Sequence, residues 1–173
     1  MSDPDEMAAK LSSLEGFAAD CAKTHYRRVS AVIFEHCESP IEKLFIGALI
    51  GAVKEKNDRI AFFIGPEIGP DVPAPERYVA FPQFEIENYR IDFLIGVGFE
   101  DHRKFFAVEC DGHDFHERTK EQAERDRYRD RQLTGLGYVC VRFTGSEIWR
   151  DPYDCAWQFI HLASQVLAGS LVG

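Results

Sequence analysis

Two acidic side chains end a short apolar run, FAVECD, over Phe106 to Asp111. Side chains alternate along a strand, so Glu109 and Asp111 would share one face, with their backbones roughly 6.8 Å apart. Both carboxylates could then lean toward one ion, or toward an ion and its waters. Gly112 follows at once and would let the chain turn sharply away. The pattern therefore predicts an anionic site at the end of a strand.

A third acid, Asp92, interrupts the run from Tyr89 to Ile95, which otherwise reads as a buried or half-buried strand. An acid in such a place is unfavourable unless it is paired or binds a metal. If the two runs form a hairpin, Asp92 lies beside Glu109, and their oxygens would suit a hard divalent cation such as Mg2+ or Mn2+. The alternative is structural: Asp92 pairs with Arg90 or Arg142, and the strand-end acids are simply solvated. The three acids together favour the metal.

The elements that would position these acids follow from periodicity, capping residues and turn signals. In chain order, the sequence predicts a helix over about Asp5 to His25, a helix beginning at Ser39-Pro40-Ile41-Glu42 with a capping box, strands over Ile60 to Ile64, Tyr78 to Glu87, Tyr89 to Ile95 and Lys104 to Asp111, a helix from Thr119 that Gly137 closes, a strand over Tyr138 to Phe143, and a helix from Asp151-Pro152. The Gly- and Pro-rich segment 65–77 is either a functional loop or a tolerated insertion.

This order of elements predicts an α/β fold in which helices flank a mixed β-sheet. The three central strands would form consecutive hairpins, and the strands on either side of the charged helix would be parallel. We expect one domain over residues 1–173, with a helical N-terminal extension (1–38), a core (39–149) and a C-terminal helix (150–173).

The overall composition suits a soluble globular domain, with 173 residues, 45% hydrophobic and 28% charged. No apolar run approaches the ~20 residues of a membrane span, and the acidic start MSDPDEMAAK lacks the features of a signal peptide, so we expect a cytoplasmic protein with no membrane partner. Five scattered cysteines without C-x-x-C spacing read as buried thiols.

The net charge of −9 opposes tight non-specific binding to a polyanion. Acid is concentrated in residues 61–111, which hold ten acidic and four basic side chains. A divalent cation bound to this segment would offset its local repulsion toward phosphate.

These residues resemble the PD-(D/E)XK nuclease superfamily, and more narrowly its very short patch repair endonuclease-like branch. The resemblance spans about residues 39 to 149. The matching text comprises Ser39-Pro40-Ile41-Glu42, Gln83, Tyr89-Arg90-Ile91-Asp92-Phe93, Val108-Glu109-Cys110-Asp111-Gly112, His116, Asp126-Arg127, Leu133, Gly137 and Arg142-Phe143. It implies a restriction-endonuclease-like core with extra N-terminal and C-terminal helices.

The resemblance also implies a catalytic metal, Mg2+ or Mn2+, bound by Asp92 and Glu109 and joined by the carbonyl of Cys110. Glu42 would reach the same site from the first core helix, although the capping box explains an acid at that position equally well. The structural zinc ligands of the repair enzyme are not evident, so its narrow mismatch specificity is not carried over.

The superfamily usually has a lysine at the position of Asp111. Another group would have to take over the role of that lysine in this chain. Lys120 could return from the next helix, Gln83 could orient the attacking water, or Asp111 could hold a second ion. We favour Gln83 with Asp111. The resemblance makes His116 a candidate general acid or base, whereas His113 has no such support; both could instead be loop histidines bonded to carbonyls.

The charged run over residues 117–131, most of which lies in the helix expected from Thr119, mixes charges of both signs. Most of it reads as a solvated face with ordinary ion pairs. Two basic ridges nevertheless run along it, one formed by Arg118, Arg125 and Arg129 and the other by Lys120, Arg127 and Arg131. One ridge could face a phosphate backbone. By the resemblance, Asp126 and Arg142 would buttress the site.

The sequence thus predicts a metal-dependent endonuclease that hydrolyses phosphodiester bonds, with DNA favoured over RNA only through the resemblance. One alternative is a nuclease-fold binding module that docks nucleic acid or a protein partner. Another is a hydrolase of small phosphoesters with His113 and His116 as ligands of a transition metal. The sequence leaves open whether the chain forms homo-oligomers.

Overall fold

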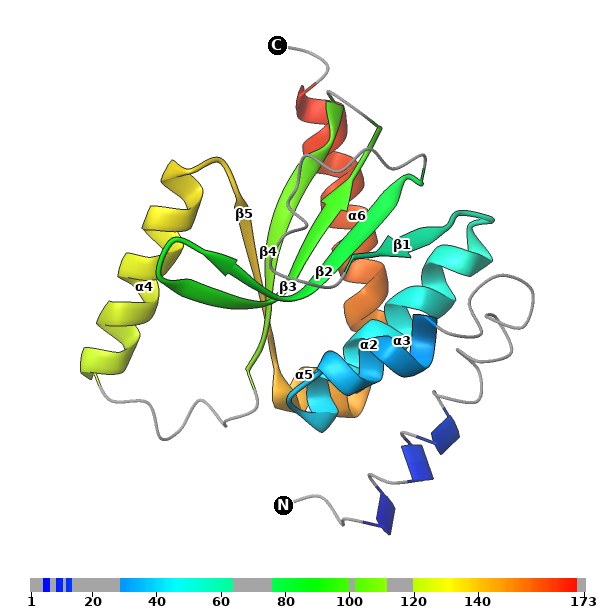
Figure 1. Cartoon of the computed structure of the whole chain (residues 1–173). Coiled ribbons are helices and arrows are strands. Elements are labelled where there is room, and N and C mark those ends of the chain that lie inside the picture. The colour runs from blue at the N-terminus through cyan, green and yellow to red at the C-terminus, as the bar shows by residue number, and fades with distance from the viewer. Residues whose placement is uncertain are drawn as a thin grey trace.

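The computed structural model describes residues 5–6, 9–10, 12–13, 29–63, 76–99, 102–111 and 120–170. Its elements, shown in Figure 1, are α2 (Val29–His36), α3 (Pro40–Glu55), β1 (Ile60–Phe62), β2 (Tyr78–Ile86), β3 (Tyr89–Val97), β4 (Lys104–Asp111), α4 (Lys120–Gly135), β5 (Val139–Thr144), α5 (Gly145–Arg150) and α6 (Pro152–Ser170). Every helix within these ranges is too short or too polar to span a bilayer.

The five strands form one mixed sheet in the order β1-β2-β3-β4-β5. β2, β3 and β4 are joined as consecutive antiparallel hairpins, whereas β1 is parallel to β2 and β5 is parallel to β4. The expected hairpins and the expected parallel pair across α4 are therefore confirmed. The mixed sheet flanked by helices is the α/β fold expected of a restriction-endonuclease-like core.

Helices cover both faces of the sheet (Figure 1). On one face, α2, α3, α5 and α6 build the main core, in which Phe45 lies 5.3 Å from Phe143 and Phe106 lies 5.4 Å from Phe159, measured between ring centroids. Because α6 supplies core side chains, the C-terminal helix belongs to the packed body of the domain. On the other face, Leu133 of α4 joins a smaller cluster with Ala107.

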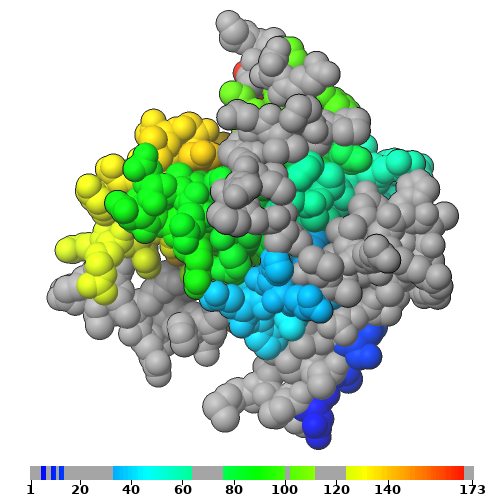
Figure 2. All heavy atoms as spheres, viewed as in Figure 1, coloured from blue at the N-terminus to red at the C-terminus, as the bar shows by residue number. Residues whose placement is uncertain are grey.

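α4 lies alongside the hairpin of β2 and β3. The space-filling view shows the yellow atoms of α4 next to the green atoms of this hairpin (Figure 2). Its sequence is strongly polar, and Leu133 is the buried residue among those of α4 whose side chains are described. The contacts that hold this helix on the sheet therefore include the packing of Leu133 and the polar contacts of Arg129 and Asp130.

At the start of α3, the predicted N-cap is present, but the predicted return contact of the capping box is not formed. Ser39 is the N-cap and accepts the N–H of Glu42 at 3.2 Å, and Pro40 opens the helix. The Glu42 carboxylate, however, accepts the N–H of Glu38 at 2.9 Å, one residue before the cap. The complete capping box occurs at α5 instead, between Thr144 and Glu147.

Two helices are not predicted from the sequence. α2 is eight residues long and rich in β-branched side chains, and α5 has six residues, so neither gives a clear helical periodicity. Several expectations lie outside the described residues: most of the helix over 5–25, the segment 64–75, and the capping role of Thr119. Among the described cysteines, Cys37, Cys110 and Cys155 are buried, Cys140 is half-buried, and all four are free thiols.

Candidate active site

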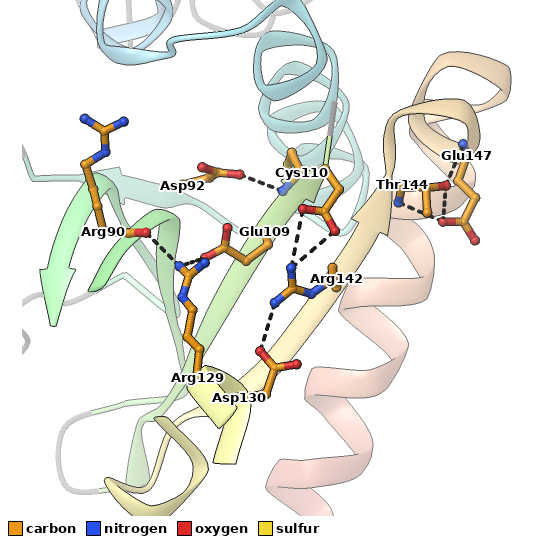
Figure 3. A network of polar contacts seen from close by, with 10 residues as sticks. Arg90, Asp92, Glu109, Cys110, Arg129, Asp130, Arg142, Thr144 and Glu147 are labelled. Atoms are coloured by element: carbon orange, nitrogen blue, oxygen red, sulfur yellow. Dashed lines mark hydrogen bonds and ion pairs between the residues drawn. The ribbon is translucent and has the colours of Figure 1, made fainter. Parts of the chain in front are cut away.

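Strand register brings Asp92 and Glu109 to neighbouring positions on the sheet. The ladder between β3 and β4 pairs Phe93 with Val108, so Asp92 and Glu109 are the next facing positions beyond it. The side chain of Asp92 turns toward β4, where its Oδ2 accepts the N–H of Cys110 at 2.7 Å (Figure 3). Within the described part of the chain, Asp92 has no ion-pair partner. The structural alternative for this acid, pairing with Arg90 or Arg142, does not occur.

Gln83 faces Asp92 from the other side. The ladder between β2 and β3 pairs Pro82 with Phe93 and Phe84 with Ile91, and it skips Gln83 and Asp92 between them. Gln83 has a φ of 50°, a left-handed conformation that is uncommon for a non-glycine residue and that interrupts the strand locally. The ladder between β4 and β5 pairs Glu109 with Arg142. Gln83, Asp92, Glu109 and Arg142 therefore form a row across four adjacent strands.

Glu42 anchors Gln83 from the start of α3. Its side chain is 4% exposed, and its Oε2 accepts from Nε2 of Gln83 at 2.9 Å. The other amide atom, Oε1 of Gln83, is buried and has no hydrogen-bond partner among the described residues. A buried acceptor without a protein partner is unusual in a folded protein, and a water or an ion is a suitable partner for it. The same contact connects Glu42 to the row of Gln83, Asp92, Glu109 and Arg142.

Arg129 of α4 is the cation closest to Glu109, and the sequence did not single it out for this role. Its Nη2 donates to Oε1 of Glu109 and, at 2.7 Å, to the backbone carbonyl of Arg90 (Figure 3). Its guanidinium also lies 5.8 Å from the ring centroid of Tyr89. One signal was available: Arg129 precedes the buried Leu133 by four residues and so shares its helix face.

Asp111 is bound to Arg142 of β5. Nη1 of Arg142 lies 3.4 Å and 3.3 Å from the two carboxylate oxygens of Asp111, and Nη2 donates to Asp130 of α4 at 2.9 Å. Arg142 thus links Asp111 at the end of β4 to Asp130 on α4. Gly112, His113 and His116 lie outside the described residues, as does the side chain of Lys120.

Burial and like charge raise the pKa values of the two central acids. Burial is the largest cause for Asp92, and the charges of Glu42 and Asp111 add to it, while the Cys110 N–H and Arg129 oppose it; the pKa is raised to about 6. For Glu109, burial and then the charge of Asp92 raise the pKa to about 8, against Arg129 and Arg142. Both carboxyl groups therefore hold a proton more readily than a solvated carboxyl group, chiefly because they are buried.

The donor set suits a hard divalent cation that keeps most of its waters. It offers the carboxylates of Asp92 and Glu109. The Cys110 side chain is packed in the main core, so the carbonyl oxygen is the atom of Cys110 that could join them. Within the described residues, no three His, Cys, Asp or Glu side chains are arranged as a metal-binding group. Two protein carboxylates with water are the ligands that Mg2+ commonly accepts.

One family of known proteins matches the part of the chain that contains the strands of this row. A family model described as REase_MTES_1575 matches residues 75–162, slightly more than half of the 173 residues. The chain belongs to this restriction-endonuclease-like family. The REase_MTES_1575 match includes Gln83, Asp92, Glu109 and Arg142, whereas Glu42 precedes it. No curated protein and no solved structure matches the chain significantly.

Proposed function

We propose that the protein is a metal-dependent endonuclease that hydrolyses phosphodiester bonds in DNA, and that it belongs to the very short patch repair-like branch of the PD-(D/E)XK superfamily. The observation that carries this proposal is the row of Gln83, Asp92 and Glu109 across three adjacent strands, inside the segment matched by a restriction-endonuclease-like family. A cation shared by Asp92 and Glu109 would offset the burial and mutual repulsion that raise the pKa of Glu109.

Asp92, Glu109 and the carbonyl of Cys110 would hold Mg2+ or Mn2+. When bound, such an ion supplies Lewis acidity toward the phosphate and lowers the pKa of a coordinated water. Arg129 bonds to Glu109 in the structure. Its guanidinium would then move from the carboxylate to a phosphate of the substrate, which is a geometry that arginine binds well.

The other side chains of the row would position the attacking water. Glu42 holds the amide of Gln83 through Nε2, which leaves Oε1 as an acceptor for a proton of that water. Arg142 holds Asp111 at the strand end, where the superfamily usually has a lysine. Gln83 and Asp111 would together take over that lysine's role, and His116 remains our candidate for proton transfer.

The test is incubation of supercoiled, linear and single-stranded DNA with the protein and Mn2+ or Mg2+, beside Asp92→Ala. The matched control is Glu55→Gln, which removes an exposed carboxylate at the far end of α3. We expect cleavage by the wild type and by Glu55→Gln, and none by Asp92→Ala or in EDTA. Intact DNA of every form with the wild type, over a range of concentrations of both metals, would refute the proposal.

One contact favours a second candidate function, a nuclease-fold binding module. Arg129 already supplies Glu109 with a positive charge, so part of the site is neutralised by the protein itself. Calorimetric titration with Mn2+ separates the two functions. The endonuclease binds Mn2+ in the wild type and loses this binding in Asp92→Ala, whereas a binding module gives the same trace for both proteins.

A further inference from the structure

A groove between α4 and the end of the β2–β3 hairpin lies beside the candidate active site. Its volume is about 750 Å³, and it is lined by Tyr89, Glu124, Arg125, Arg127, Tyr128 and Arg131. This volume falls within the range of sites that take a molecule the size of a nucleotide. The groove is partly open to solvent. Figure 2 shows the adjoining surfaces of α4 and the hairpin.

The charge of the groove is opposite to that of the molecule. Three arginines and one glutamate line it, in a chain whose net charge is −9. Arg125 and Arg131 are exposed, so their guanidinium groups can reach a ligand without unfolding the helix. Arginine binds phosphate through paired N–H donors. The groove is therefore complementary to a phosphate backbone, although the surface of this acidic protein as a whole is not.

Two tyrosines give the groove faces on which flat rings can stack. Tyr128 is 54% exposed, one of the few large apolar side chains on the described surface, and its ring centroid lies 5.9 Å from the guanidinium carbon of Arg131. Proteins that bind single-stranded nucleic acids commonly place an arginine beside an aromatic ring, because every base has a face that can stack on the ring. In a duplex these faces are already covered by neighbouring bases.

The groove is joined to the acids through Tyr89 and Arg129. Tyr89 lines the groove, and the guanidinium of Arg129 lies over its ring while bonding to Glu109. A nucleotide stacked in the groove would therefore have its neighbouring phosphate next to Arg129 and the row of acids.

We propose that this groove binds an unpaired segment of nucleic acid, with a base stacked on Tyr128 and phosphates held by Arg125 and Arg131. The inference rests on the proposed nuclease function and specifies its substrate as single-stranded or locally unpaired. Stacking compensates for the weak electrostatic attraction of an acidic protein, so affinity depends on the aromatic ring as well as on charge.

The test measures binding without cleavage. Fluorescence anisotropy in EDTA compares a labelled oligothymidylate single strand with a duplex of equal length. We expect the wild type to prefer the single strand, Tyr128→Ala to weaken that binding roughly 5- to 100-fold, and Tyr128→Phe to retain it. Phe99→Ala, which removes an equally exposed ring from another part of the described surface, is the control and should bind like the wild type. Arg131→Gln should also lower the salt dependence of binding.

Two results would overturn the inference: equal affinity for single strand and duplex, or full binding by a folded Tyr128→Ala protein. Its failure is distinguishable from that of the nuclease proposal. If the protein binds the single strand but does not cleave it in Mn2+, the groove proposal stands and the nuclease proposal fails. If Tyr128→Ala cleaves duplex DNA at the wild-type rate and the wild type shows no preference for single strands, the groove proposal fails and the nuclease proposal stands.

Discussion

At the scale of single residues, Arg129 determines the state of the metal-free site. It is the helix residue that reaches Glu109, and both side chains are largely buried. Removing the guanidinium leaves a buried carboxyl group without its partner. We expect Arg129→Gln to lower the free energy of unfolding by about 1–3 kcal/mol, measured by urea denaturation in EDTA. The exposed Arg131→Gln is the matched control on the same helix and should change it by less than about 0.5 kcal/mol.

Mn2+ provides a second measurement on the same variant. If a cation takes the place of the guanidinium, adding Mn2+ should restore part of the stability that Arg129→Gln loses. Equal stability of the two arginine variants in EDTA would mean that the pair with Glu109 contributes nothing to the fold.

The raised pKa of Glu109 predicts how stability depends on pH. In the folded protein this carboxyl keeps its proton up to about pH 8, whereas its ordinary pKa is 4.5. Between these values the folded state binds more protons than the unfolded state, so the free energy of unfolding falls as pH rises. Asp92, with a pKa raised from 3.8 to about 6, adds to this fall in the lower part of the range.

Urea denaturation in EDTA between pH 5 and 8.5 measures this dependence. Glu109→Gln should give a flatter curve than the wild type, and Glu55→Gln should keep the wild-type slope. Stability that rises with pH in this range would show that Arg129 keeps Glu109 ionised near neutral pH.

At the scale of elements, the N-terminus of α3 connects helix capping to the site. Ser39 caps the helix, and Glu42, on the first turn, holds Gln83. We expect Ser39→Ala to lower the free energy of unfolding by about 0.5–2 kcal/mol and Ser39→Asp to retain it, because aspartate caps equally well. Thermal denaturation of both variants measures the effect. Identical melting of Ser39→Ala and the wild type would mean that the cap does not stabilise α3.

The strands could be predicted because their signals are local. Alternation and turn residues placed β4 at its observed bounds, and the hairpin with β3 followed from the short connection between them. The positive φ of Gln83 could not be predicted, because the side chain that bonds to Gln83, that of Glu42, is distant in sequence. The contact between Arg129 and Glu109 was missed for the same reason, since the charge pattern of α4 does not reveal which cation faces the sheet.

At the scale of the whole molecule, charge and metal binding are coupled. The chain has a net charge of −9, and its central acids are crowded and buried. A divalent cation that binds only the folded state should raise the free energy of unfolding by about 2.7 kcal/mol at a concentration 100 times its Kd. Thermal denaturation with increasing Mn2+ measures this gain. Asp92→Ala should show no such gain, and an equal rise in wild type and variant would place the bound cation elsewhere.

The hydrogen bond from Cys110 to Asp92 has a spectroscopic consequence. The amide of Cys110 in β4 donates to the carboxylate of Asp92. A proton or cation that binds Asp92 would bind this same carboxylate. The NMR resonance of the Cys110 amide and its rate of solvent exchange should therefore respond directly to occupancy of Asp92. This single backbone signal can report how the site fills, without substrate and without any engineered label.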